Sequence, residues 1–275
     1  MVFLACAGGT EGRGDGDDDD DGQGGASSGS GAGGLDIGVG GQGAGTQLPA
    51  EVFAHSATRL FKLDPITKQV TTVGTFSGCN NNVTDIALDE NGEMYATVLN
   101  GLYRIDKETA VCSFIASGPY PNSLSFVPKG TVDANEETLV GYVDASYVRI
   151  DKQTGAKTDI GVLGNGKYLS SGDVVSVIGG GTYLTVKGFD CGDCLVEVNP
   201  TTGALVQVVS VLSFTNVFGL AFWGGSAYGF NDAGELFEIN LATGDTTVIE
   251  MPDAPASLSF WGAGSTTAAP LTPPE

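Results

Sequence analysis

The sequence predicts an all-β protein: a five-bladed β-propeller, closed into a ring by its C-terminal inner strand and preceded by a disordered tether. Three observations lead to this prediction. One short motif occurs five times, its copies follow one another at intervals of 41 to 48 residues, and a glycine-rich stretch precedes the first copy. The four-stranded blades of propellers repeat at about this interval.

The first 49 residues read as an anchor and a tether. Residues 1–6, MVFLAC, resemble the end of a bacterial lipoprotein signal, although its basic start is missing, and Cys6 is then the lipid attachment site. Residues 7–49 are mostly Gly, Ser, Ala, Gln and Asp, a composition that cannot offset its ordering entropy. We therefore expect an exported bacterial lipoprotein, periplasmic or on the cell surface, that touches the membrane through its lipid alone.

The repeated motif describes a strand followed by a tight turn. Its copies are Leu60–Thr67, Leu102–Thr109, Tyr147–Gly155, Leu195–Gly203 and Leu236–Gly244. In each copy an Asp or Asn ends an alternating apolar run, and its side chain can accept a hydrogen bond from the backbone N–H two residues on. Gly155, Gly203 and Gly244 can supply the positive φ that such a turn needs. A second strand follows each turn, so the motif predicts a hairpin.

A further strand with small residues precedes most motif copies and suits the crowded centre of a propeller. These predicted inner strands are Thr84–Leu88, Ser123–Phe126, Asp173–Val177, Gly219–Phe222 and Ser257–Phe260. The last has no blade after it, whereas the first motif copy lacks an inner strand. We therefore expect residues 256–261 to close the ring beside residues 52–54, which removes the unpaired sheet edges. The propeller then covers residues 50–262, and residues 263–275 form a disordered tail. Trp223 and Trp261 end inner strands and are expected in the core.

The repeats resemble a broad family of bacterial propeller-repeat proteins, which includes quinoprotein-like and surface-layer propellers. The pattern Leu-[Phe/Tyr]-x-Ile-Asp-x-x-Thr-Gly carries the resemblance, over about residues 51–261. The resemblance implies the fold. Quinoprotein repeats usually add a tryptophan a few residues after the glycine, where this chain has Ala204–Val206 and Asp245–Thr247. A quinone cofactor is therefore not implied, and we expect no cofactor.

The charge of the chain argues against nucleic acid as a partner. The chain has 33 acidic and 12 basic residues, and the part after residue 49 has a formal net charge of −14. Such a domain repels phosphate backbones, and no cluster of Lys and Arg offers a local basic surface. We expect a monomer that does not bind nucleic acid.

Four cysteines remain if Cys6 carries a lipid, and an even number fits an oxidising compartment. They are Cys79, Cys112, Cys191 and Cys194. Three pairings are possible, of which a Cys191–Cys194 disulfide is favoured, while a bond between Cys79 and Cys112 requires loops that the sequence does not place. The flanks of the Cys-x-x-Cys segment read as strands, which disfavours a redox role. With His55 as the single histidine, a zinc site is disfavoured as well.

Candidate binding residues lie in the loops that lead into the inner strands. They are Asn82, Tyr120, Asn122, Tyr168 and Asn216, and the connection at Phe189 and Asp190 is expected on the same face. Aromatic rings and amides around a concave mouth can bind a sugar or a peptide. Ordinary turn chemistry is the alternative interpretation.

Asp85 and Asp173 begin inner strands two blades apart and could point into the central channel. A carboxylate pair there could hold calcium or act as acid and base, whereas capping of strand ends is the structural alternative. The corresponding residues Ser123, Gly219 and Ser257 cannot ionise. The sequence therefore favours a non-enzymatic binding or scaffolding module for a protein or glycan. The alternative is a carbohydrate-active hydrolase or lyase, possibly with calcium.

Overall fold

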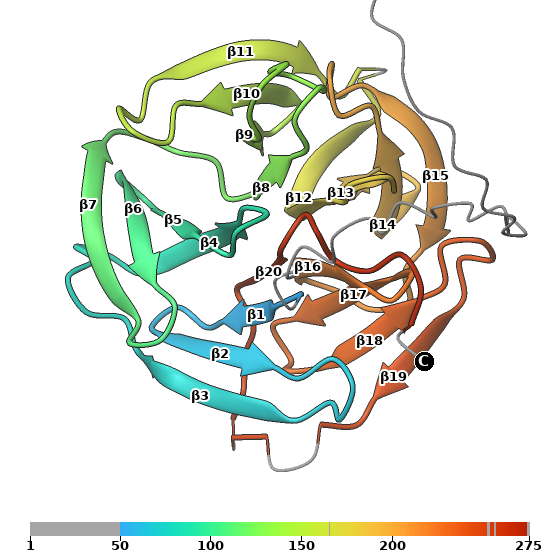
Figure 1. Ribbon diagram of the computed structural model, residues 1–275. Helices are drawn as coiled ribbons and strands as arrows, with labels where there is room; N and C mark the ends of the chain where they lie inside the picture. The colour runs from blue at the N-terminus through green and yellow to red at the C-terminus, as the bar shows by residue number, and fades with distance from the viewer. Residues whose placement is uncertain (1–49, 165, 252–253, 256, 274–275) are drawn as a thin grey trace, which may run out of the picture. The chain divides into compact units, whose positions relative to one another are not determined.

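The structure is a computed structural model that describes residues 50–164, 166–251, 254–255 and 257–273. In this part of the chain, twenty strands form five antiparallel four-stranded sheets, arranged as blades around a central axis (Figure 1). The predicted five-bladed β-propeller is confirmed. Across the described ranges, no helix is long and apolar enough to cross a membrane. Cys6 and the predicted tether, residues 7–49, lie outside the described residues.

Each blade is built from four strands, here given from the axis outward. Blade 1 contains β20 (Gly262–Ser265), β1 (Val52–His55), β2 (Arg59–Leu63) and β3 (Val70–Thr75). Blade 2 contains β4 (Val83–Leu88), β5 (Met94–Val98), β6 (Gly101–Asp106) and β7 (Val111–Ser117). Blade 3 contains β8 (Leu124–Val127), β9 (Thr138–Val143), β10 (Ser146–Ile150) and β11 (Lys157–Val162). Blade 4 contains β12 (Tyr168–Ser176), β13 (Thr182–Gly188), β14 (Cys191–Val198) and β15 (Leu205–Val211). Blade 5 contains β16 (Val217–Trp223), β17 (Ser226–Asn231), β18 (Leu236–Ile239) and β19 (Thr246–Ile249).

The inner strands surround the axis in the order β4, β8, β12, β16 and β20, and each contacts the next around the ring (Figure 1). The face on which these strands begin is called the mouth face below. The hydrophobic core lies between neighbouring blades. Phe53 and Leu60 of blade 1, for example, pack against Ile86, Met94 and Tyr103 of blade 2.

The turns predicted from the repeat are present in all five blades. The side chains of Asp64, Asp106, Asp151, Asn199 and Asn240 each accept hydrogen bonds from the backbone N–H groups two and three residues on. The residue that completes each turn has a positive φ, between 59° and 77°, in every copy. In blades 1 and 2 this residue is Lys68 or Ala110 rather than glycine.

The prediction of the closing strand was wrong by several residues. The strand that pairs with β1 is β20, Gly262–Ser265, in the register Val52 to Ser265 and His55 to Gly262. Residues 256–261 do not form it, and the predicted tail from residue 263 begins within this strand. The reason is crowding at the axis: a Cβ added at Gly219 would lie 2.8 Å from the backbone nitrogen of Ala263. A Cβ added at Gly262 of β20 would likewise lie 2.3 Å from Nε2 of His55, so small residues suit this strand.

The described chain enters and leaves blade 1 on the face opposite the mouth. There the backbone N–H of Thr266, directly after β20, donates to the carbonyl oxygen of Glu51 at 3.2 Å. The Glu51 carboxylate forms ion pairs with Lys62 and Lys107. The start of β1 and the end of β20 are therefore held together at this face.

The described residues form two disulfides. Cys191 and Cys194 are bonded within β14, as the sequence favoured. Cys79, in the connection after β3, is bonded to Cys112 of β7. This second bond joins blade 1 to blade 2 and resolves the pairing that the sequence left open.

Candidate functional site at the mouth of the channel

A pocket of about 280 Å³ lies on the mouth face, where the five inner strands begin. Its lining residues are Thr84, Asn122, Gly172, Phe218 and Trp261. Each blade contributes one of them: Thr84 and Phe218 are the second residues of β4 and β16, Asn122 and Trp261 precede β8 and β20, and Gly172 lies within β12, directly before Asp173. The five residues, called the mouth ring below, therefore surround the axis of the propeller.

Trp261 is the largest side chain of the mouth ring. It directly precedes β20 and is 40% exposed, so its predicted place in the core was wrong, whereas Trp223 is buried as expected. Phe218 is half-buried, and Nζ of Lys187 lies 5.7 Å from its ring centroid. The ring thus combines two aromatic side chains with the amide of Asn122 and the hydroxyl of Thr84.

The next residue of each blade forms a second ring directly below the mouth ring. Its members are Asp85, Ser123, Asp173, Gly219 and Gly262, and all are buried. The fifth member is Gly262 rather than Ser257, because the closing strand begins later than predicted. Two carboxyl groups and a serine hydroxyl therefore lie beneath the pocket.

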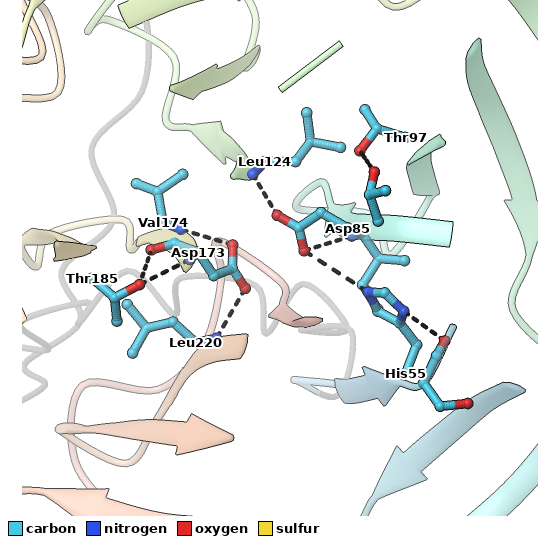
Figure 2. A network of polar contacts seen from close by, with 11 residues as sticks. His55, Asp85, Thr97, Leu124, Asp173, Val174, Thr185 and Leu220 are labelled. Atoms are coloured by element: carbon cyan, nitrogen blue, oxygen red, sulfur yellow. Dashed lines mark hydrogen bonds and ion pairs between the residues drawn. The ribbon is translucent and has the colours of Figure 1, made fainter. Parts of the chain in front are cut away.

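Asp85 joins blade 2 to blade 3. Its Oδ1 accepts a hydrogen bond from the N–H of Ile86 at 2.8 Å, and its Oδ2 accepts one from the N–H of Leu124 at 2.6 Å (Figure 2). A side chain that accepts from its own strand and from the adjacent inner strand holds the two blades at a fixed separation.

Asp173 repeats this arrangement between blades 4 and 5. Its Oδ1 accepts from the N–H of Val174 at 2.7 Å and its Oδ2 from the N–H of Leu220 at 2.9 Å (Figure 2). The backbone amide of Ala263 in β20 also favours the charged form of this carboxyl. Asp173 therefore contacts the closing strand as well as its neighbouring blade.

His55, at the mouth end of β1, completes the buried polar cluster. Its Nδ1 lies 3.0 Å from the carbonyl oxygen of Ser56, which places the ring proton there, and its Nε2 faces Oδ1 of Asp85 at 4.0 Å. Nε2 has no hydrogen-bond partner among the described residues, and neither has Oγ of Ser123. Two polar atoms beside the channel are thus unsatisfied.

Burial dominates the protonation of this cluster. Desolvation raises the pKa of Asp85 well above its ordinary value, and the nearby Asp173 carboxyl raises it further. Desolvation likewise raises the pKa of Asp173, and it lowers the pKa of His55 to about 4. A charged group loses its hydration here without gaining an opposite charge, so burial opposes ionisation of each group and opposes ionisation of both carboxyls together most strongly.

The other predicted site residues lie in different places. Of the loop candidates, only Asn122 lines the mouth pocket. Asn82 is exposed in a separate groove of about 410 Å³ beside the Cys79–Cys112 bond, and Tyr120 donates its hydroxyl proton to the carbonyl oxygen of Gly155 at 2.8 Å.

Two further candidates are engaged in the fold itself. Tyr168 is buried against the core between blades 3 and 4. The N–H of Asn216 donates to Asp193 at 2.8 Å, and its side-chain amide donates to Asp232 at 3.0 Å. Pro252 and Asp253, in the last loop, lie outside the described residues.

No metal centre is evident among the residues that the structure describes, because none of their His, Cys, Asp and Glu side chains gather in groups of three or more that could hold an ion. The oxygens of Asp85 and Asp173 already accept backbone hydrogen bonds. Calcium typically takes about six to eight oxygen ligands. The described cluster does not offer that number.

Residues 138–268 match a family described as a repeat of unknown function, DUF6923. No curated protein is significantly similar in sequence. Among solved structures, a protein of unknown function from Bacteroides caccae is similar at 15% identity with a TM-score of 0.42, covering 78% of this chain and 77% of that one. The family match agrees with a chain built from repeats.

Proposed function

We propose that this propeller is an exported, non-enzymatic binding module that holds a glycan in the pocket formed by the mouth ring. The observation that carries the proposal is the exposed indole of Trp261 beside Phe218, Asn122 and Thr84. The apolar face of a sugar ring packs on an aromatic side chain, while amide and hydroxyl groups bind its hydroxyls. The mouth ring provides both kinds of contact within one pocket.

The size of the pocket supports a small ring rather than a protein loop. Its volume of about 280 Å³ is near the lower end of the roughly 300 to 1,000 Å³ typical of small-molecule sites. The strong negative charge of the domain, −14 after residue 49, also argues against polyanionic ligands. A neutral sugar unit fits both restrictions.

The buried carboxyl groups favour binding over hydrolysis or elimination. A catalytic acid or base must come within hydrogen-bond distance of the reacting atom. Asp85 and Asp173 are fully buried, and both oxygens of each accept backbone N–H groups. Their geometry suits a role in holding the blades together.

The two disulfides agree with export to an oxidising compartment. Attachment of a lipid to Cys6 belongs to this proposal, and intact-mass measurement of the protein purified from membranes tests it. A mass equal to that of the unmodified chain would refute the anchor.

The glycan proposal is tested by calorimetric titration of the full chain with neutral gluco-, xylo-, manno- and chito-oligosaccharides. We expect at least one series to bind, and Trp261→Ala to weaken that binding at least tenfold. Phe114→Ala is the matched control, because Phe114 is an exposed aromatic residue on β7, away from the mouth ring.

Two results would contradict the proposal. One is the absence of binding by every series. The other is an equal loss of affinity in the Trp261 and Phe114 variants. Binding of a peptide library that Trp261→Ala abolishes, without any bound sugar, would assign the pocket to a protein ligand instead.

A further inference from the structure

Trp261 is connected to the buried polar cluster through its own backbone. Its N–H donates to the carbonyl oxygen of His55 at 2.8 Å. The following residue, Gly262, lies against the cluster, since an added Cβ would be 2.3 Å from Nε2 of His55 and 2.6 Å from Oδ1 of Asp85. The position of the exposed indole therefore depends on where β20 rests.

The cluster contains two carboxyl groups and no cation. β1 contributes His55, β4 contributes Asp85, and β12 contributes Asp173 and, at its far end, Tyr168. The described residues of β8, β16 and β20 contribute no titratable side chain. Because the proton of His55 lies on Nδ1, its Nε2 lone pair faces Oδ1 of Asp85, which is also an acceptor.

A proton on the carboxyl pair reduces the negative charge that the cluster must hold. When the carboxyl pair holds one proton, it carries a single negative charge, which the four backbone N–H donors stabilise. The two carboxyl groups interact with each other, and when both ionise, two like charges occupy a buried site, which costs far more than in water. The surrounding structure must then move apart or admit water.

The closing strand is the part of the wall that contacts both the buried cluster and Trp261. β20 has four residues and joins its sheet only through β1, from which it is separated in sequence by the other four blades. The other inner strands each continue into a hairpin of their own blade. Relief of charge repulsion at Asp85 and Asp173 is therefore expected to displace β20 and Trp261 with it.

We propose that Asp85 and Asp173 are positioning residues that share one proton, hold β20 against the channel, and thereby fix Trp261 in the mouth ring. The site is then assembled at acidic and neutral pH and loosens at alkaline pH. The effect on glycan affinity rests on the proposed function, whereas the movement of Trp261 does not.

The test uses the fluorescence of Trp261 in the full chain carrying Trp223→Phe, which removes the only other tryptophan. Between pH 5 and pH 10 we expect the emission to shift to the red and acrylamide quenching to increase at least twofold, while the far-UV circular dichroism stays constant. Asp173→Asn, which cannot ionise, should remove this transition.

A flat emission across this range, or an equal shift in the Asp173→Asn variant, would overturn the proposal. If that variant fails to fold, hydrogen exchange of the Trp223→Phe chain tests the same proposal. The protection factors of β20 amides should fall with rising pH while those of β9 do not, and a parallel change in both strands would count against the proposal.

Oligosaccharide titration at pH 6 and pH 10 separates the positioning role from the proposed glycan binding. Fluorescence that titrates without any bound sugar rejects the proposed function alone, and bound sugar with flat fluorescence rejects the positioning role alone.

Discussion

Glu137 is a buried carboxyl on the face opposite the mouth, and its replacement by glutamine gives a quantitative test of the structure. Its Oε2 accepts from the N–H of Glu90 at 2.6 Å, and its Oε1 is hydrogen-bonded to the hydroxyl of Thr267. Desolvation raises the pKa of Glu137 from an ordinary 4.5 to about 7. The side chain thus ties blade 3 to blade 2 and to the segment after β20.

The direction of the pH effect follows from the raised pKa. Below pH 4.5 Glu137 is protonated in both the folded and the unfolded chain, and its contribution to stability is fully present. Between pH 4.5 and 7 the folded chain binds more protons than the unfolded chain, so stability falls as the pH rises. From pH 5 to pH 8 this loss amounts to about 2.5 kcal/mol.

Glu137→Gln resembles the protonated acid, because its oxygen can face the N–H of Glu90 while its NH₂ group donates to Thr267. We expect the variant to be close to the parent chain in stability at pH 5 and more stable by about 2 kcal/mol at pH 8. Urea unfolding of both chains at the two pH values measures this double difference, in which the other titrating groups cancel. Glu136→Gln, at an exposed neighbouring position, is the control. A stability difference that is the same at both pH values would refute the reasoning.

Three further predictions concern stability. Removing the bond between Cys79 and Cys112, which are 33 residues apart, by alanine substitution of both should lower the free energy of unfolding by about 3 to 4 kcal/mol in urea titrations, and an unchanged midpoint would contradict this. Gly203→Ala should lower the free energy of unfolding by more than about 2 kcal/mol, because φ at this position is 67° and the new Cβ would lie 2.4 Å from a side-chain carbon of β10. The control is Gly192→Ala, which has open space around it and should unfold at the parental temperature. Phe189→Ala should leave the unfolding temperature unchanged within about 1 °C, because Phe189 is fully exposed, and a clear decrease would reveal a contact that the structure lacks.

The blades were predictable because their determinants are local. An Asp or Asn that accepts from the next two or three N–H groups needs no distant partner, so Asp64, Asp151 and Asn240 mark their turns in the sequence itself. The same logic explains why the number of blades follows from the number of motif copies.

The closing strand and the mouth ring depend on contacts between distant residues. Gly262–Ser265 has neither alternation nor β-branched residues, and it is placed by its pairing with β1 and by the crowding at Gly219. The neighbouring Ser257–Phe260 had the stronger strand pattern, which misplaced Trp261. Shifting the strand to Gly262 would have aligned Trp261 with Asn122 and revealed the ring.

The burial of Tyr168 could not be predicted from the sequence for a different reason. It follows a loop on the mouth face, yet β12 is lengthened by an irregularity in its pairing between Ser170 and Val174. The longer strand carries Tyr168 into the core between blades 3 and 4. Such an insertion within a repeat changes which residue reaches the surface, but it does not change the motif that predicts the blade.

The junction of Glu51 with Lys62, Lys107 and the backbone of Thr266 determines how the molecule can be attached. The described chain begins on the face opposite the mouth, so a force applied through residues before position 50 acts on that face. Immobilisation on a sensor chip by the N-terminal segment should consequently leave the mouth ring unobstructed.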